Sequence, residues 1–132
     1  MKIVRHTVAH LCELAGFPRK ERSNSMLAVD EACTNIIKHT YKGAADQIII
    51  IKTTINDDMI QFILRDFGKK IDLKQIKSRD LDDIRPGGLG VHLIKTIMDE
   101  VIYDNTPEVG NQLTLIKYRT KERRRGNKHQ ND

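Results

Sequence analysis

Apolar residues recur at helical spacing in two stretches at the start of the chain. In the first stretch the apolar positions are Val4, Val8, Leu11, Cys12 and Ala15. They predict an amphipathic helix that ends at Gly16 and Pro18. The second stretch predicts a helix over residues 22–40. Its apolar stripe consists of Met26, Val29, Cys33, Ile36 and Ile37.

Four later stretches are rich in β-branched and apolar residues. Residues 47–55 and 59–65 flank the turn-forming residues 56–58, which predicts a β-hairpin. Residues 101–105 and 112–119 predict a second strand pair, joined by residues 106–111. Between the pairs, residues 67–87 form a long charged connection that resembles a lid, and residues 87–90 lead into a helix. The fold class is therefore α+β, with helices on one face of a mixed, mostly antiparallel sheet.

Composition supports one globular domain. The chain has 132 residues, of which 39% are hydrophobic and 31% are charged, and its mean hydropathy is -0.50. No apolar run approaches the ~20 residues of a membrane-spanning helix. We expect a domain over residues 1–119, located in the cytoplasm.

Most of the net charge of +5 lies at the end of the chain. Residues 119–132 contain six basic and two acidic residues, which leaves a net charge of +1 for residues 1–118. We interpret residues 120–132 as a basic, disordered tail. A contact with nucleic acid is the alternative that the charge leaves open, but no aromatic residue follows Tyr118 to stack on bases.

The cysteines and histidines do not indicate a zinc site. Cys12 and Cys33 occupy apolar helical positions, so we expect buried, reduced thiols. The five histidines lack the close His or Cys companions of a zinc-binding motif.

The second predicted helix carries a polar stripe opposite its apolar one. Glu31, Asn35 and His39 follow one another at intervals of four residues and share one helix face. A solvated outer face explains such a stripe as well as a site does.

Two further segments favour a ligand. Asp66 and Gly68 stand at the end of an apolar strand, where a carboxylate could accept a hydrogen bond from a ligand amine; a turn aspartate is the alternative. Residues 87–90, Gly-Gly-Leu-Gly, directly precede a helix, whose first turn offers free N–H groups to phosphate. A flexible turn explains the glycines about equally well.

The order of these signals is more specific than any one of them. Glu-x-x-x-Asn on a helix, Asp-x-Gly after a hairpin, a lid-like segment and Gly-x-Gly before a helix resemble the GHKL ATP-binding fold, a two-layer α/β sandwich. Residues 29–35 (VDEACTN) and 87–94 (GGLGVHLI) resemble the bacterial anti-sigma factor serine/threonine kinases more closely. The resemblance extends to about Arg119.

The resemblance implies roles for the residues of the polar stripe. Asn35 matches the asparagine that ligates the Mg²⁺ bridging the ATP phosphates, a role that an amide oxygen can fill. Glu31 matches the glutamate that acts as general base on the attacking hydroxyl or water.

The resemblance also implies the contacts of the base and the phosphates. Asp66 matches the aspartate that accepts a hydrogen bond from the adenine amino group, and Gly68 gives the ring room. Thr114 on the last strand would lie near adenine. The phosphate-binding turn would be formed by Gly88 and Gly90 with the backbone amides of Leu89 and Val91.

Two features depart from the family pattern. The family usually has a strand before the first helix, but Met1 falls almost at the start of that helix here, so we expect this strand to be absent. Lys70 stands where the adenine motif often has a second glycine.

These observations predict a cytoplasmic regulator that uses ATP or ADP with Mg²⁺. By the resemblance, it would phosphorylate a serine on an antagonist protein, bind a sigma factor and form a homodimer. The alternative is a catalytically inactive nucleotide-binding module that only contacts partners.

Overall fold

The computed structural model describes residues 2–44, 47–74, 76 and 90–119. In chain order the elements are α1 (Lys2–Leu14), α2 (Arg19–Asn35), the π-helix η1 (Ile36–Thr40), β1 (Ile49–Ile55), β2 (Met59–Asp66), α4 (Gly90–Ile97), β3 (Glu100–Asp104) and β4 (Asn111–Tyr118). The predicted tail and most of the lid-like segment lie outside the described residues. No strand precedes α1 within the described part of the chain.

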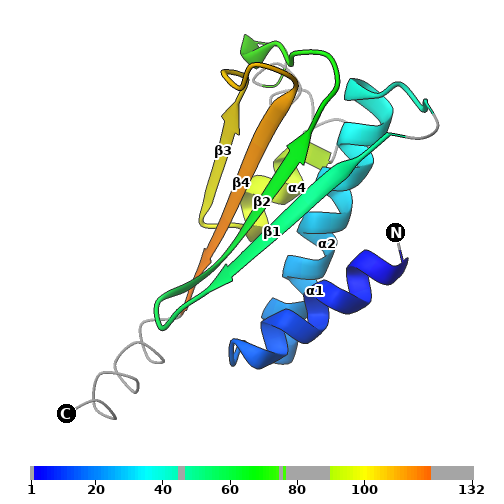
Figure 1. The fold of residues 1–132 in the computed structure, drawn as a ribbon. Coiled ribbons are helices and arrows are strands. Elements are labelled where there is room, and N and C mark those ends of the chain that lie inside the picture. The colour runs from blue at the N-terminus through cyan, green and yellow to red at the C-terminus, as the bar shows by residue number, and fades with distance from the viewer. Residues whose placement is uncertain (1, 45–46, 75, 77–89, 120–132) are drawn as a thin grey trace.

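The four strands form one sheet in the order β1-β2-β4-β3. Each strand pair is antiparallel, so the predicted hairpin and the predicted second pair are both confirmed. Figure 1 shows the helices on one side of the sheet, which confirms the predicted α+β architecture. α2 contacts α1 along one flank and α4 along the other.

The second helix differs from its prediction at both ends. It begins at Arg19 and changes at Ile36 into η1, where the amide N–H of Tyr41 donates to the carbonyl of Ile36 (2.9 Å). Such a turn is wider than an α-helical turn and shifts the residues that follow it around the helix axis. Ile37, expected on the apolar stripe, is therefore 38% exposed.

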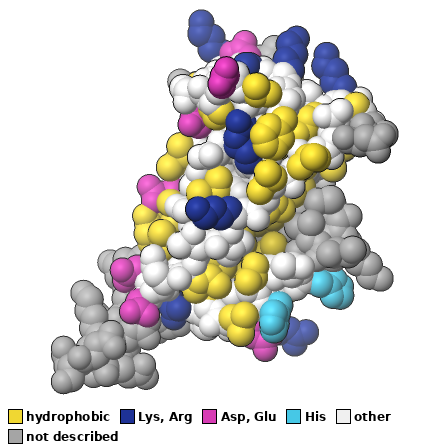
Figure 2. All heavy atoms as spheres, in the orientation of Figure 1, with side chains coloured by type: hydrophobic (Ala, Val, Ile, Leu, Met, Phe, Trp, Pro, Cys, Tyr) yellow, Lys and Arg dark blue, Asp and Glu magenta, His cyan; other side chains and the backbone are white. Residues whose placement is uncertain are grey.

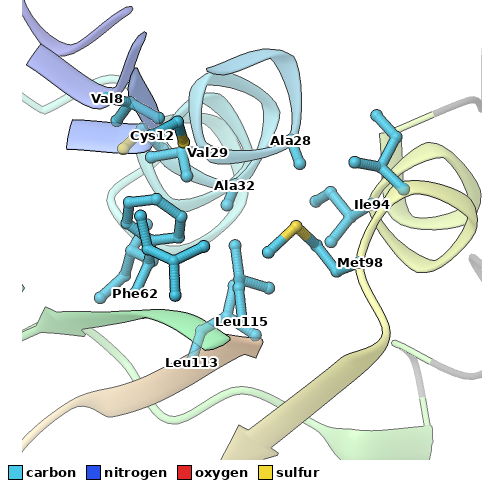
Figure 3. Close-up of a cluster of buried hydrophobic side chains, with 14 of the residues drawn as sticks. Val8, Cys12, Ala28, Val29, Ala32, Phe62, Ile94, Met98, Leu113 and Leu115 are labelled. Atoms are coloured by element: carbon cyan, nitrogen blue, oxygen red, sulfur yellow. The ribbon is translucent and has the colours of Figure 1, made fainter. Parts of the chain in front are cut away.

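The hydrophobic core lies between α2 and the sheet. Figure 3 shows Phe62 and Leu115 of the sheet pointing towards Val29 and Ala32 of α2. Small residues on α2 allow close packing, so that Ile94 and the other apolar residues of α4 reach the same core.

No helix of the described residues covers the opposite face of the sheet. Ile50 and Ile102 on this face are about half exposed, and Figure 2 shows hydrophobic side chains gathered over the sheet with basic side chains among them. In the described part of the chain, no helix combines the length and the apolar character needed to cross a membrane.

Both cysteines are free and buried, as predicted. Burial raises the pKa of the Cys12 thiol to about 11, against a smaller lowering by a hydrogen bond with Ser25. Burial raises the pKa of the Cys33 thiol to about 12, and the nearby charge of Asp30 adds to this shift. Both thiols are therefore protonated at neutral pH.

These pKa values predict a loss of stability at high pH. Above pH 9, the ordinary thiol pKa, the cysteines ionise in the unfolded chain but stay protonated in the folded one until about pH 11 and 12. Each thiol should then lower the free energy of unfolding by about 1.4 kcal/mol per pH unit within its window. Urea unfolding between pH 8 and 11 measures the slope.

Tyrosines and lysines titrate in the same range, so the control is the double variant Cys12→Ala/Cys33→Ala. Its stability should fall less steeply with pH than that of the wild type. Equal slopes for the two proteins would contradict the prediction.

Candidate functional site

A carboxylate is buried where β2 ends. Asp66 is only 3% exposed, although it lies at the last position of its strand. Its Oδ1 accepts hydrogen bonds from the amide N–H of Gly68 (3.0 Å) and from Nδ2 of Asn111 (3.1 Å). Its Oδ2 has only a long contact of 3.4 Å with the same Nδ2. One carboxylate oxygen therefore keeps most of its capacity to accept a hydrogen bond.

Gly68 brings the chain after β2 against η1. A Cβ at this position would lie 2.6 Å from Cγ2 of Thr40 and 2.9 Å from Cε1 of Tyr41. The hydroxyl of Tyr41 holds the same region: it accepts from the amide N–H of Phe67 (2.8 Å) and donates to the carbonyl of Ile48 (2.5 Å). A side chain at residue 68 would thus force apart the elements that surround Asp66.

Asn111 is a site residue that the sequence reasoning missed. It is the first residue of β4 and the register partner of Asp66, and it is 3% exposed. Its Nδ2 also donates to the carbonyl of Lys69 (2.9 Å), and its Oδ1 accepts from the amide N–H of Ile71 (2.8 Å). The available signal was a polar residue on the inward side of the alternation with Leu113 and Leu115.

The side chain of Lys70 contacts the turn before β4. Its ammonium donates to the carbonyls of Pro107 and Gly110, the latter at 2.8 Å. Arg65 holds the same turn, because its guanidinium donates to the carbonyls of Val109 and Asn111. The lysine that stands in place of the second glycine therefore connects the loop after β2 to the turn before β4 through these hydrogen bonds.

The polar stripe of α2 reaches a cavity through one of its residues. Asn35 lines a small cavity of about 30 Å³, together with Thr40, Ile71 and Val91. Neither Glu31 nor Asn35 has a side-chain hydrogen bond within the described part of the chain, and both are half-buried. Asn35 therefore offers a free amide oxygen, with the Glu31 carboxylate one helical turn away.

His39 is separated from this pair. His39 lies within η1 and lines a second, larger cavity of about 420 Å³. Lys42, Lys69 and Lys70 line the same cavity together with Asp72, so basic residues outnumber acidic ones in its wall. The two cavities share Thr40 and Ile71, so an apolar hollow and a basic hollow adjoin each other.

The start of α4 lies beside Asn35. α4 begins at Gly90, and Val91 is buried and lines the same small cavity as Asn35. The structure thus brings Asn35 of the polar stripe together with the helix start that follows the glycine-rich segment. Gly88 and Leu89 lie outside the described residues.

Thr114 is not brought to this site. Its register partner on β2 is Ile63, three residues from Asp66, so the side chains of Thr114 and Asp66 lie on opposite faces of the sheet. The structure therefore does not bring Thr114 to Asp66, and its expected position near adenine stays a prediction. Asn111 lies on the face of Asp66 in its place.

The sequence model of the histidine kinase-like ATPase domain matches residues 1–117. The chain belongs to this family. Its curated relatives include the serine-protein kinase RsbW of Staphylococcus epidermidis, which is 34% identical over 96% of this chain and 84% of its own length. RsbW of Bacillus subtilis strain 168 is 32% identical over 92% of this chain and 79% of its own length.

Solved structures share the fold at low sequence identity. The histidine kinase domain of the blue-light activated kinase from Erythrobacter litoralis has a TM-score of 0.59 and 15% identity, and covers 76% of this chain. The match spans 45% of that kinase chain. The mycobacterial sensor histidine kinase MprB has a TM-score of 0.52 and 16% identity over 74% of this chain and 71% of its own.

Gly110 provides a test of how tightly the site is packed. Its φ is +73°, and a Cβ would overlap the carbonyl of Asp66 and lie 2.6 Å from Cα of Phe67. We expect Gly110→Ala to lower the free energy of unfolding by about 3 kcal/mol or more, because backbone strain and overlap add together. Chemical denaturation measures the loss.

Gly43→Ala is the matched control. Gly43 has a φ of +75°, but a Cβ there would meet no atom within 4 Å. Only the strain of the left-handed backbone remains, at about 1 to 2 kcal/mol. Similar losses for the two variants would show that the turn before β4 yields easily and does not hold Asp66 in place.

Proposed function

We propose that this domain binds ATP with Mg²⁺ and transfers the γ-phosphoryl group to a serine of a partner protein. One observation supports the proposal. Asn35 and the start of α4 line one cavity, and two other residues that line it, Thr40 and Ile71, border the loop that begins at Asp66. A site for adenine, a site for a metal ion and a site for phosphates would therefore adjoin in the order that a nucleotide requires.

The residues present fit a nucleotide. Asp66 keeps one oxygen available for the amino group of a base, and the amides of Gly90 and Val91 lie in the first turn of α4, where backbone N–H groups have no helical acceptor. Lys42 and Lys69 add positive charge at the neighbouring cavity. Residues 88 and 89 would complete the phosphate-binding turn.

Asn35 fits a magnesium ion that is also bound by phosphates. Mg²⁺ takes oxygen ligands and often binds through one or two protein groups plus the phosphates of the substrate. When bound, Mg²⁺ would neutralise negative charge on the phosphates. Within the described residues, no cluster of three or more His, Cys, Asp or Glu forms a separate metal site.

Glu31 is the proposed general base. A carboxylate one turn before the metal-ligating amide can accept the proton of a serine hydroxyl that approaches the γ-phosphate. Because phosphoryl transfer depends mainly on positioning and on charge, the rigid spacing of Glu31 and Asn35 on α2 is the contribution of this helix.

The partners follow from the resemblance. We propose that the phosphorylated protein is a small antagonist and that a sigma factor is bound in the other nucleotide state. The support is the 32–34% identity to kinases named serine-protein kinase RsbW. The cytoplasmic location, the homodimer and the disordered tail stay predictions.

Nucleotide binding tests the site first. Isothermal titration of the wild type should show ATP binding that strengthens when Mg²⁺ is added. Asn35→Ala should lose the effect of Mg²⁺ but keep metal-free binding, because only the metal ligand is removed. Asp66→Asn should weaken binding about tenfold or more with and without Mg²⁺, because an amide nitrogen now competes for the position of the acceptor. Equal affinities for all three proteins would contradict the assigned roles.

Phosphoryl transfer tests the enzyme. With radiolabelled ATP and a serine-bearing antagonist protein, Glu31→Gln should lower the transfer rate by about 10² to 10⁴-fold, because the base is removed. The affinity for ATP should change by less than about threefold. Transfer at the wild-type rate by this variant would exclude Glu31 as the base.

The control is Glu21→Gln, which makes the same change on the first turn of the same helix. This variant should transfer at the wild-type rate. If the wild type binds ATP but transfers nothing to any antagonist tested, the domain is a nucleotide-binding module and not a kinase.

A further inference from the structure

The larger of the two cavities has an excess of positive charge in its wall, and we call it the basic cavity. Lys42, Lys69 and Lys70 line it, with His39 beside them and Asp72 as the acidic residue of the lining. The three lysines are exposed, so the cavity opens to solvent. Its volume of about 420 Å³ lies in the range of cavities that hold ligands.

Two of the three lysines have no partner in the protein. Within the described part of the chain, Lys42 and Lys69 make no hydrogen bond or ion pair. The carboxylate of Asp72 accepts from a backbone N–H of its own loop (2.9 Å) and pairs with neither lysine. Lys70 differs, because its ammonium donates to carbonyls of the turn before β4 and interacts with the charge of Asp104. Lys42 and Lys69 therefore carry the charges that are available to an anion.

The backbone holds these two lysines in place. Lys42 follows η1 with a φ of +50°, and no other non-glycine residue among those described has a positive φ. A left-handed residue at a helix end is usually glycine or asparagine, because a larger side chain is disfavoured there. The carbonyl of Lys69 accepts from Nδ2 of Asn111 (2.9 Å), and the preceding Gly68 lies against η1. One charge thus extends from the helical layer and the other from the loop after β2.

The basic cavity adjoins the cavity proposed for the metal ion and the phosphates but does not contain their binding groups. Thr40 and Ile71 line both cavities. Asn35 and Val91 line only the small one. A molecule in the basic cavity would therefore lie beside the nucleotide without displacing it.

The exposure of the lysines favours a ligand with several negative charges. A single carboxylate would gain little from them, because water and salt screen the attraction between exposed charges. Several carboxylates on one chain can contact several lysines at once, and their contributions then combine. A protein segment rich in Asp and Glu fits this arrangement better than an isolated anion does.

We infer that the basic cavity docks an acidic segment of the protein that accepts the phosphoryl group. The inference rests on the proposed function and identifies the chemistry by which the domain holds its protein substrate. Opposite charges also steer the two proteins together and favour one orientation of the complex.

The test measures the binding of a fluorescein-labelled hexaglutamate peptide by fluorescence anisotropy, without nucleotide. The wild type should bind this peptide and should not bind hexalysine. Lys42→Gln/Lys69→Gln should weaken the binding of hexaglutamate about fivefold or more, because both unpaired charges are removed. A wild type that does not bind hexaglutamate overturns the inference.

Lys20→Gln/Lys52→Gln is the matched control. It removes the same net charge from two other exposed lysines, one on the first turn of α2 and one on β1. This variant should change the affinity for hexaglutamate by less than about twofold, because distant exposed charges are screened. Equal losses for the two double variants would show that the peptide responds only to net charge, which also overturns the inference.

A competition experiment separates a docked segment from nucleotide phosphates. With saturating ATP and Mg²⁺, the affinity of the wild type for hexaglutamate should stay within about threefold of its value without nucleotide, because the two sites are separate. Displacement of the peptide by ATP would show that the basic cavity holds phosphates of the nucleotide, and it would overturn the inference.

Inhibition of phosphoryl transfer connects the cavity to the protein substrate. Hexaglutamate should inhibit transfer competitively with the antagonist protein and not with ATP. Transfer that hexaglutamate does not inhibit overturns the inference and leaves the kinase standing. A wild type that binds hexaglutamate through Lys42 and Lys69 but binds no ATP refutes the proposed function, and the identity of the docked protein with it.

Discussion

A carboxylate buried at the end of β2 imposes the constraint on which the candidate site depends. Burying the charge of Asp66 is costly unless hydrogen-bond donors surround it. The fold supplies them from the loop that follows, through Gly68, and from the neighbouring strand, through Asn111. To bring both donors close, the chain must turn sharply after Asp66 and again before β4. The close approach at Gly68 and the left-handed backbone of Gly110 are the local results.

The arrangement of the helical layer depends on a different constraint, the packing of α2 on three sides. α2 must bury one side against the sheet while its two flanks contact α1 and α4, and small residues such as Ala28 and Ala32 make this possible. At the end of α2, the π-helix η1 buries Ile36 in the core and places His39 at the wall of the basic cavity. As a result, the polar stripe is divided: Asn35 borders the small cavity, and His39 borders the larger one.

The pattern of the sequence predicted the elements but not the register. Alternation and helical spacing are local properties, so both strand pairs and the first helix could be located without coordinates. The face on which a strand residue lies depends on its parity relative to a partner, and one step reverses it. The sequence therefore could not show that Thr114 lies on the face opposite Asp66, and Asn111 was taken as part of a turn. The π-helix was missed because the four-residue spacing of the polar residues in the sequence continues through it and gives no sign of the wider turn.

The two layers of the fold also divide the proposed chemistry. In the proposed function, base recognition would depend on Asp66, whose register partner on the neighbouring strand, Asn111, donates a hydrogen bond to it. Metal binding and proton transfer would depend on Asn35 and Glu31, which share one helix. The layers meet at the loop and helix end that carry Ile71 and Thr40. The packing of α2 on the sheet would therefore determine the distance between the sites proposed for the base and for the phosphates. Core residues such as Phe62, which lie between α2 and the sheet, would thereby influence the alignment of the proposed reaction without belonging to the site.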